Sequence, residues 1–154
     1  LPKPILNKGG CNLSFAGLKT AVLKITKNIK TEQEKFDLAA SFQSTIEKIL
    51  YKKTKTAFNQ YEKINNLKNK RFVVAGGVAA NRKIRTMLKK LCEENNYQSL
   101  FPPIELCGDN AAMIAMVGLE KYKLQKFNSL DHPAIPRWPL DEQAVFLKGA
   151  GVKL

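Results

Sequence analysis

The pattern of apolar and polar positions in the first part of the chain predicts two helices. Apolar residues recur at helical spacing over residues 18–29, with lysines between them, so a basic amphipathic helix is expected there. A second helix is expected to begin near Thr31, because Thr31 and Glu34 have the spacing of a capping box. Its apolar stripe reaches Tyr61. Before both helices, the alternation in residues 11–15 predicts a half-buried strand.

The middle of the chain alternates between strand and helix signals. The apolar run of residues 72–75 predicts a buried strand, and Gly76-Gly77 predicts a tight turn after it. A helix is expected from about Ala79, followed by a short strand over residues 97–101 that ends at two prolines. This alternation predicts an α/β architecture.

The C-terminal part is predicted to contain one more helix and an irregular tail. Asp109 occupies the position of an N-cap ahead of an alanine-rich helix. From Asn128 onward prolines recur and periodicity is weak, so residues 130–154 are expected to be an irregular tail over the surface. The only histidine, His132, is therefore expected in a surface loop.

Composition and charge narrow the classes of protein. A chain of 154 residues with 44% hydrophobic residues can bury one core. No apolar run approaches the length of a transmembrane helix. The net charge of +13 favours a nucleic-acid partner, but abundant lysine, asparagine and isoleucine are also typical of chains encoded by AT-rich DNA. Lys52, Lys53 and Lys55 are expected on a solvated face, with a specific contact as the alternative.

The cysteines and the first residues indicate the setting of the chain. Cys11, Cys92 and Cys107 are widely spaced, without a Cys-x-x-Cys pair, which argues against a disulfide framework or a zinc ribbon. Structural thiols in a reducing compartment are expected. The first residues lack an initiator methionine and resemble no signal peptide, so the chain is expected to be a piece of a longer protein.

Gly76, Gly77 and Asn81 form a candidate nucleotide-binding turn. Without a Cβ, the glycines allow a ligand to approach the backbone, and the following helix offers free N–H groups to a phosphate or a sugar hydroxyl. Asn81 can donate and accept hydrogen bonds, which suits a base or a ribose. The stretch is neither a Walker motif nor a GxGxxG fingerprint, and glycines that merely turn the chain are the alternative.

Asp109 is a candidate metal ligand. Its carboxylate could coordinate a hard or borderline cation, but one carboxylate is not a metal site, and an ordinary N-cap is the alternative. The chain contains no Ser/His/Asp set and no HExxH, so a complete hydrolytic site is not expected within it.

Four stretches, in this order and at these separations, resemble the C-terminal half of the TsaD family (also called Gcp, or the Kae/OSGEP group). They are residues 13–20 (LSFAGLKT), 74–82 (VAGGVAANR), 107–115 (CGDNAAMIA) and 136–141 (PRWPLD). The resemblance implies that residues 1–154 form the C-terminal lobe of a two-lobe protein. The implied fold is an actin/Hsp70-like, ribonuclease-H-related α/β lobe with a mixed sheet flanked by helices.

The resemblance also implies an activity and its site. The family's full protein transfers a threonylcarbamoyl group from threonylcarbamoyl-AMP to N6 of a tRNA adenosine beside the anticodon. The asparagine that binds the adenylate corresponds to Asn81, within the motif that contains Gly76 and Gly77, and a metal-ligating aspartate corresponds to Asp109. The metal, iron or zinc, would act as a Lewis acid on the carbamoyl carbonyl.

Other parts of the family's machinery are not in this chain. The remaining metal ligands are two histidines of an N-terminal HxxxH helix, so the chain alone is expected to be inactive and to bind metal poorly. TsaB-, TsaE- and TsaC-like partners and a cytoplasmic location are implied. Gly108, Ala16 and Ile135 depart from the residues common in the family, which puts fine substrate contacts in question.

Two other functions compete with the enzyme hypothesis. In one, the chain is a non-catalytic basic module that docks tRNA or partner proteins. In the other, it belongs to a secreted metallo-glycoprotease (O-sialoglycoprotein endopeptidase), an older description of the family. The missing HExxH, the absence of a signal peptide and the unpaired thiols argue against the protease.

Overall fold

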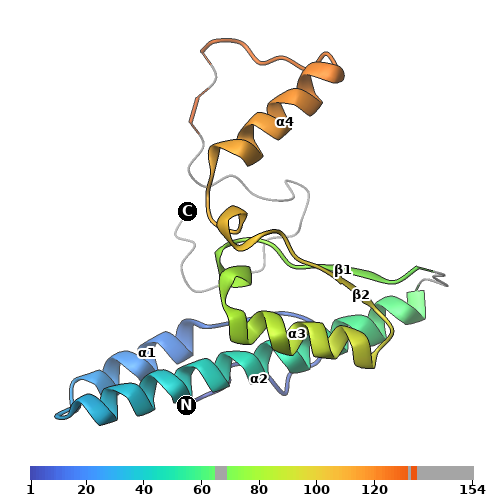
Figure 1. The fold of residues 1–154 in the computed structure, drawn as a ribbon. Coiled ribbons are helices and arrows are strands. Elements are labelled where there is room, and N and C mark those ends of the chain that lie inside the picture. The colour runs from blue at the N-terminus through green and yellow to red at the C-terminus, as the bar shows by residue number, and fades with distance from the viewer. Residues whose placement is uncertain (65–68, 132, 135–154) are drawn as a thin grey trace. The chain divides into compact units, whose positions relative to one another are not determined.

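The computed structural model describes residues 1–64, 69–131 and 133–134, and the chain divides into two compact units. The first unit spans Leu1–Asp109 and the second begins at Asn110. Figure 1 shows the order of the elements along the chain. No helix among the described residues is long and apolar enough to cross a bilayer.

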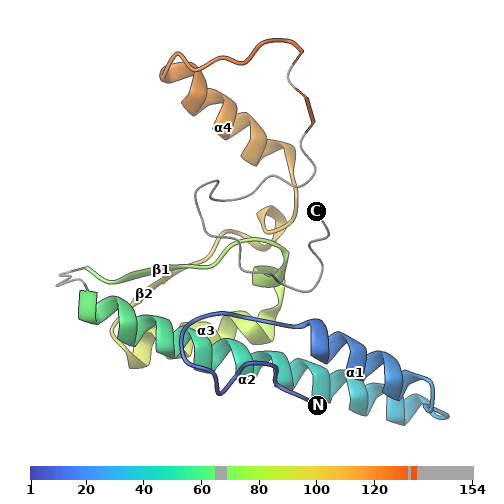
Figure 2. The ribbon, with the colours of Figure 1, turned by 180° about the vertical axis from the view of Figure 1, so that it is seen from behind.

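Two helices, α1 (Ala16–Thr26) and α2 (Glu32–Ile64), open the first unit and lie side by side over the first part of α2 (Figures 1 and 2). The predicted capping box is confirmed, because the Glu34 N–H donates to Thr31 Oγ1 at 3.2 Å. The N–H groups of Lys30 and Thr31 donate to Glu34 Oε2 at 2.8 and 3.1 Å. These two backbone bonds hold the pKa of the Glu34 carboxyl below its usual value, and the bond from Lys30 has the larger effect.

A strand–helix–strand segment follows, made of β1 (Arg71–Val73), α3 (Arg82–Glu94) and β2 (Gln98–Leu100). The strands pair in parallel, with Phe72 opposite Ser99. Both predicted strands and the α/β class are therefore confirmed. The described sheet has these two strands only and is parallel, whereas a mixed sheet was expected.

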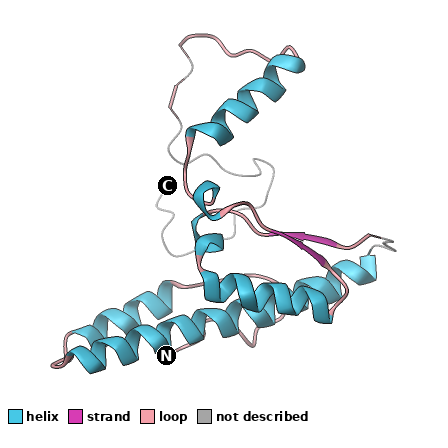
Figure 3. Cartoon of the chain, viewed as in Figure 1, coloured by secondary structure: helices cyan, strands magenta, loops and turns pink. Residues whose placement is uncertain are grey.

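The helices α2 and α3 cover one face of the sheet (Figure 3), and the core lies between them. Phe58 stacks on Tyr97 with 3.9 Å between ring centroids and meets Phe72 edge-on at 5.1 Å. Val73, on the opposite face, is 65% exposed, so the expectation of a fully buried strand is wrong. The buried members of this core are Phe58, Ile84, Leu88, Leu91, Cys92 and Tyr97.

The segment before α1 runs along α2 (dark blue in Figure 2), and residues 11–15 form no strand. The chain just before these residues is held by a side chain of α2. Lys53 is 4% exposed, and its Nζ donates to the carbonyl oxygens of Lys8 at 2.8 Å and Gly10 at 3.0 Å. The expectation of a solvated face is therefore wrong for Lys53, although Lys52 and Lys55 are exposed.

The three thiols are free, so the expectation that no disulfide forms is confirmed. Cys92 and Cys107 are buried, whereas Cys11 is exposed and its thiol donates to Gln60 Oε1 at 3.0 Å. Burial raises the pKa of the Cys92 thiol, and the charge of Glu93 adds to the effect.

The second unit contains α4 (Ala111–Lys123). Its N-cap is Asn110, whose Oδ1 accepts from the Met113 N–H at 3.0 Å. The expectation that Asp109 caps this helix is therefore wrong by one position. Most of the predicted irregular tail at residues 130–154 lies outside the described residues. His132 and the motif at residues 136–141 lie wholly outside them.

Candidate functional site

The Gly76-Gly77 turn has a backbone conformation that favours glycine. Gly76 has φ +85°, a region that residues with a Cβ rarely adopt. A Cβ built at Gly76 or Gly77 would meet nothing within 4 Å. The turn leads into the 3₁₀ helix η1 (Gly77–Ala80), which is why α3 begins at Arg82 and not near Ala79. The glycines therefore turn the chain and also leave the backbone open to approach.

Asn81 caps α3 and is held in one orientation. Its Oδ1 accepts from the Ile84 N–H at 3.1 Å, and its Nδ2 donates to Gln43 Oε1 at 2.9 Å. Gln43 Nε2 in turn donates to Glu47 Oε1 at 2.7 Å and lies 3.4 Å from Asn81 Oδ1. Since an amide nitrogen carries two hydrogens, Asn81 Nδ2 retains a donor for a ligand.

A cavity of about 630 Å³ lies against this amide pair. Gln43, Asn81 and Gly77 line it, together with apolar side chains that include Leu13, Phe15, Phe42 and Ile46. A mostly apolar pocket with a few fixed polar groups is the usual form of a small-molecule site. A flat aromatic base with hydrogen-bonding edges fits this lining.

Arg85 links the glycine turn to the segment that leads to Asp109. Its Nε donates to the Ala79 carbonyl at 3.0 Å, and its Nη2 donates to the Pro102 carbonyl at 3.0 Å and contacts Cys107 Sγ at 3.3 Å. The guanidinium carbon lies 4.9 Å from the centroid of the Phe101 ring. A second 3₁₀ helix, η2 (Ile104–Leu106), contacts η1 in the same region.

Asp109 is the last residue of the first unit and is exposed. Its carboxylate can offer one oxygen ligand to a divalent cation. Within the described residues, no group of three His, Cys, Asp or Glu side chains could hold a metal ion. Asp109 therefore stays a single candidate ligand in the described part of the chain.

Comparison with known proteins decides the family. The model of the TsaD family, described as tRNA N6-adenosine threonylcarbamoyltransferase, matches residues 1–116, about three quarters of the chain. The chain belongs to the TsaD family. The family resemblance inferred from the sequence motifs is therefore confirmed.

Three relatives carry the name tRNA N6-adenosine threonylcarbamoyltransferase. The protein of Pelagibacter ubique strain HTCC1062 is 71% identical over 154 residues, which are 100% of this chain and 43% of the relative. Those of Rickettsia rickettsii strain Sheila Smith and Rickettsia canadensis strain McKiel are 46% and 47% identical over 144 residues, 92% of this chain and 42% of each relative. The chain thus spans less than half the length of these relatives.

Within this TsaD-family chain, the structure brings Gly76, Gly77 and Asn81 together at one turn. Two residues that border them, Gln43 and Arg85, were missed in the sequence analysis. Gln43 is a polar residue within the apolar stripe of α2, and that position is the signal that could have singled it out. Arg85 follows the buried Ile84, but nothing in the sequence indicates that its guanidinium reaches the carbonyl of Pro102.

Proposed function

We propose that this chain is the part of a tRNA N6-adenosine threonylcarbamoyltransferase that holds the adenylate of threonylcarbamoyl-AMP. The observation that carries the proposal is the oriented Asn81 amide beside a cavity of about 630 Å³, at the turn that contains Gly76 and Gly77. Residues 1–154 would form the C-terminal, actin/Hsp70-like lobe of the whole enzyme, with residues 130–154 as its irregular tail.

Each residue has a separate task in this proposal. The second hydrogen on Asn81 Nδ2 donates to the base or the ribose, and the open backbone at Gly76 and Gly77 lets the adenylate lie close to the chain. Asp109 would supply one carboxylate to a divalent metal, iron or zinc, and this metal would polarise the carbamoyl carbonyl. The other ligands come from a histidine pair outside this chain.

The reaction joins N6 of the tRNA adenosine to the carbamoyl carbon and releases AMP. Binding energy from the adenylate holds the carbamoyl group in position, so the chain's contribution is orientation of the donor. We further propose that the enzyme works in the cytoplasm with TsaB-, TsaE- and TsaC-like proteins.

The experiment uses a chimera in which this chain replaces the aligned 43% of the Pelagibacter ubique relative. Asn81→Asp keeps an oxygen to cap α3 but removes the Nδ2 donor. We expect the KM for threonylcarbamoyl-AMP to rise by about 5- to 10-fold, the worth of one hydrogen bond, and circular dichroism to show that the helices are kept although the bond to Gln43 is lost. Transfer is measured as modified adenosine in tRNA by mass spectrometry. An unchanged KM would rule out the role of Asn81.

A second candidate function is a basic module that docks tRNA without chemistry. It is favoured by the exposed lysines on α2 and α3, which include Lys48, Lys83 and Lys90. Lys53 does not belong to that set, because it holds the segment before α1. In this case the chimera would bind tRNA but transfer nothing, and Asn81→Asp would leave tRNA binding unchanged.

A further inference from the structure

A groove between α2 and α3 is lined mainly by cations. It consists of two adjoining hollows of about 400 and 450 Å³, which share Glu47 and Met87 as lining residues. We call this surface the basic groove. Its cations are Lys3 from the N-terminal segment, Lys48 and Lys52 from α2, and Arg82, Lys83 and Lys90 from α3.

These cations are not neutralised by the described part of the chain. The ion pairs there are Lys35–Glu32, Lys70–Glu62 and Lys123–Glu120, all away from the groove. Glu47 is the one acid that lines it, and its Oε1 already accepts a hydrogen bond from Gln43. Lys52 Nζ donates to Asn7 Oδ1 at 2.9 Å, but this amide is neutral and leaves the charge in place. Ammonium groups gathered in a hollow without neutralising carboxylates attract a polyanion.

The position of two cations on α3 supports a ligand role. Arg82 and Lys83 lie in the first turn of α3, which contains no acidic residue. Positive side chains are unfavourable there, because the N-terminus of a helix already carries partial positive charge. Helix stability therefore does not explain these residues, whereas an anion at this place would relieve the repulsion.

We propose that the basic groove binds the phosphate backbone of tRNA, an inference that rests on the proposed function for the identity of the nucleic acid. The groove adjoins the adenylate cavity. Arg82 directly follows Asn81, and Glu47 of the groove is bonded to Gln43 of the cavity wall. A strand that follows the groove would therefore reach the place where the threonylcarbamoyl donor is bound.

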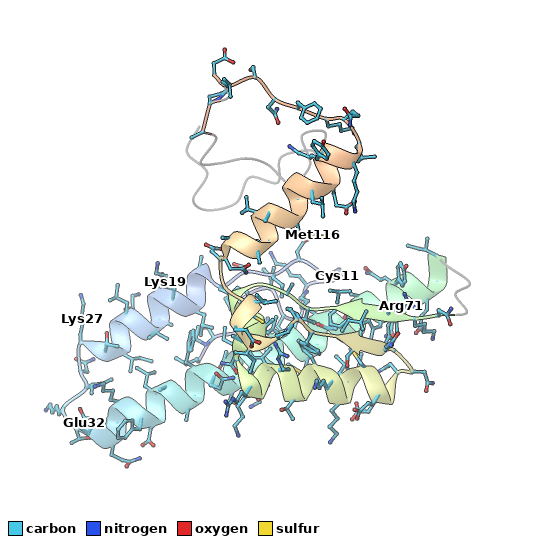
Figure 4. The ribbon with its side chains drawn as sticks, turned by 45° about the horizontal axis from the view of Figure 1, so that its top comes forward. Cys11, Lys19, Lys27, Glu32, Arg71 and Met116 are labelled. Carbon is cyan, nitrogen blue, oxygen red and sulfur yellow. The ribbon has the colours of Figure 1, made fainter. Side chains whose placement is uncertain are left out.

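The test neutralises three groove lysines in the full chain, as the triple variant Lys48→Gln, Lys83→Gln and Lys90→Gln. The side chains of all three residues are exposed. The matched control is Lys24→Gln, Lys27→Gln and Lys30→Gln, which removes the same charge near the end of α1. Figure 4 shows Lys27 at that end, beyond Lys19 along the helix.

Binding of fluorescently labelled, unmodified tRNA is measured by anisotropy at several salt concentrations. We expect the groove variant to lose at least about tenfold in affinity, and the slope of log K against log salt to fall by about 3, about one per phosphate contact. The control variant should lose less than about threefold. Circular dichroism verifies that both variants keep the helices.

Several results would overturn the inference. The first is an equal loss of affinity in the two variants, which would show that net charge alone matters. The second is unchanged tRNA binding by the groove variant, and the third is no tRNA binding by the unaltered chain. Displacement of tRNA by polyglutamate at equal charge would favour an acidic protein partner instead. If the basic groove fails this test, the proposed function can still hold, because the Asn81→Asp experiment measures the KM for the acyl donor and not the binding of tRNA.

Discussion

Single side chains at the candidate site are positioned by partners far away in the sequence. Gln43 and Asn81 are 38 positions apart and exchange an amide hydrogen bond of 2.9 Å. Arg85 joins the carbonyls of Ala79 and Pro102 through one guanidinium. A lysine at position 85 would not reproduce this, because an ammonium lacks the planar fork of donors.

Replacement of Gln43 tests whether the amide pair matters for function. We expect Gln43→Ala in the chimera to raise the KM for threonylcarbamoyl-AMP by about 3- to 10-fold with a smaller change in kcat, because the free Asn81 amide can rotate away from the ligand. Gln43→Glu keeps an acceptor for Asn81 Nδ2 and should recover part of the loss. Steady-state kinetics with varied donor measure this.

The matched control for Gln43 is Gln33→Ala, on the exposed first part of α2. Gln33 Nε2 bonds only to Asp37 within the same helix, at 2.9 Å. A purely structural role for Gln43 would lower the melting temperature and leave the KM unchanged, and that outcome would contradict the positioning role.

At the scale of elements, residues close in sequence decide where a helix begins, whereas tertiary packing decides whether a predicted strand forms. The capping box at Thr31 starts α2 through contacts within four residues, so it was predictable. The strand expected over residues 11–15 does not form, since no strand among the described residues pairs with it, and this partner is not visible in the local pattern. The first nine residues of α4, 111–119, are all apolar, which is typical of a helix that is covered on every side.

The carboxylate of Glu34 gives the start of α2 a defined pH dependence. Its pKa is lowered in the folded chain by the N–H groups of Lys30 and Thr31, so its stabilisation is present above the unfolded pKa and is lost as pH falls through the folded value. We expect amide exchange at Lys30 and Thr31 to accelerate as pH falls below about 4.5, beyond the intrinsic rate. Glu34→Gln should abolish this acid-dependent step, as measured by NMR.

Glu32→Gln is the control, since Glu32 pairs with Lys35 at 3.4 Å on an exposed surface and bonds to neither amide. Loss of the acid-dependent step in this variant would show that general helix fraying, and not the capping box, causes it.

At the scale of the whole chain, 154 residues span less than half the length of the TsaD-family relatives, and large apolar side chains are exposed. The outer face of the sheet leaves Val73 65% exposed, and Phe36 on α2 is 60% exposed. Large exposed apolar side chains are typical of surfaces that other parts of a protein or a partner cover.

Metal binding belongs to this scale, because Asp109 offers one ligand and catalytic metal sites commonly use three from the protein. We expect the chain alone to bind Zn²⁺ or Fe²⁺ orders of magnitude more weakly than the chimera in calorimetric titration. Asp109→Ala should weaken binding by the chimera and leave the chain alone unaffected. Tight binding by the chain alone, or threonylcarbamoyl transfer by it, would contradict this division of the site.

The sequence by itself determined the features that depend on neighbouring residues or on family motifs. These are the capping box, the turn at Gly76, both short strands, and Asn81 and Asp109 as the candidate site residues. Only the tertiary structure decided that Lys53 is buried, that Gln43 orients Asn81 and that Arg85 connects two loops. The physical reason is that each contact needs two segments that are distant in sequence. Lys53 needs the N-terminal segment to lie along α2, the Gln43–Asn81 bond needs α3 to pack on α2, and the Arg85–Pro102 bond needs the chain after β2 to lie beside α3.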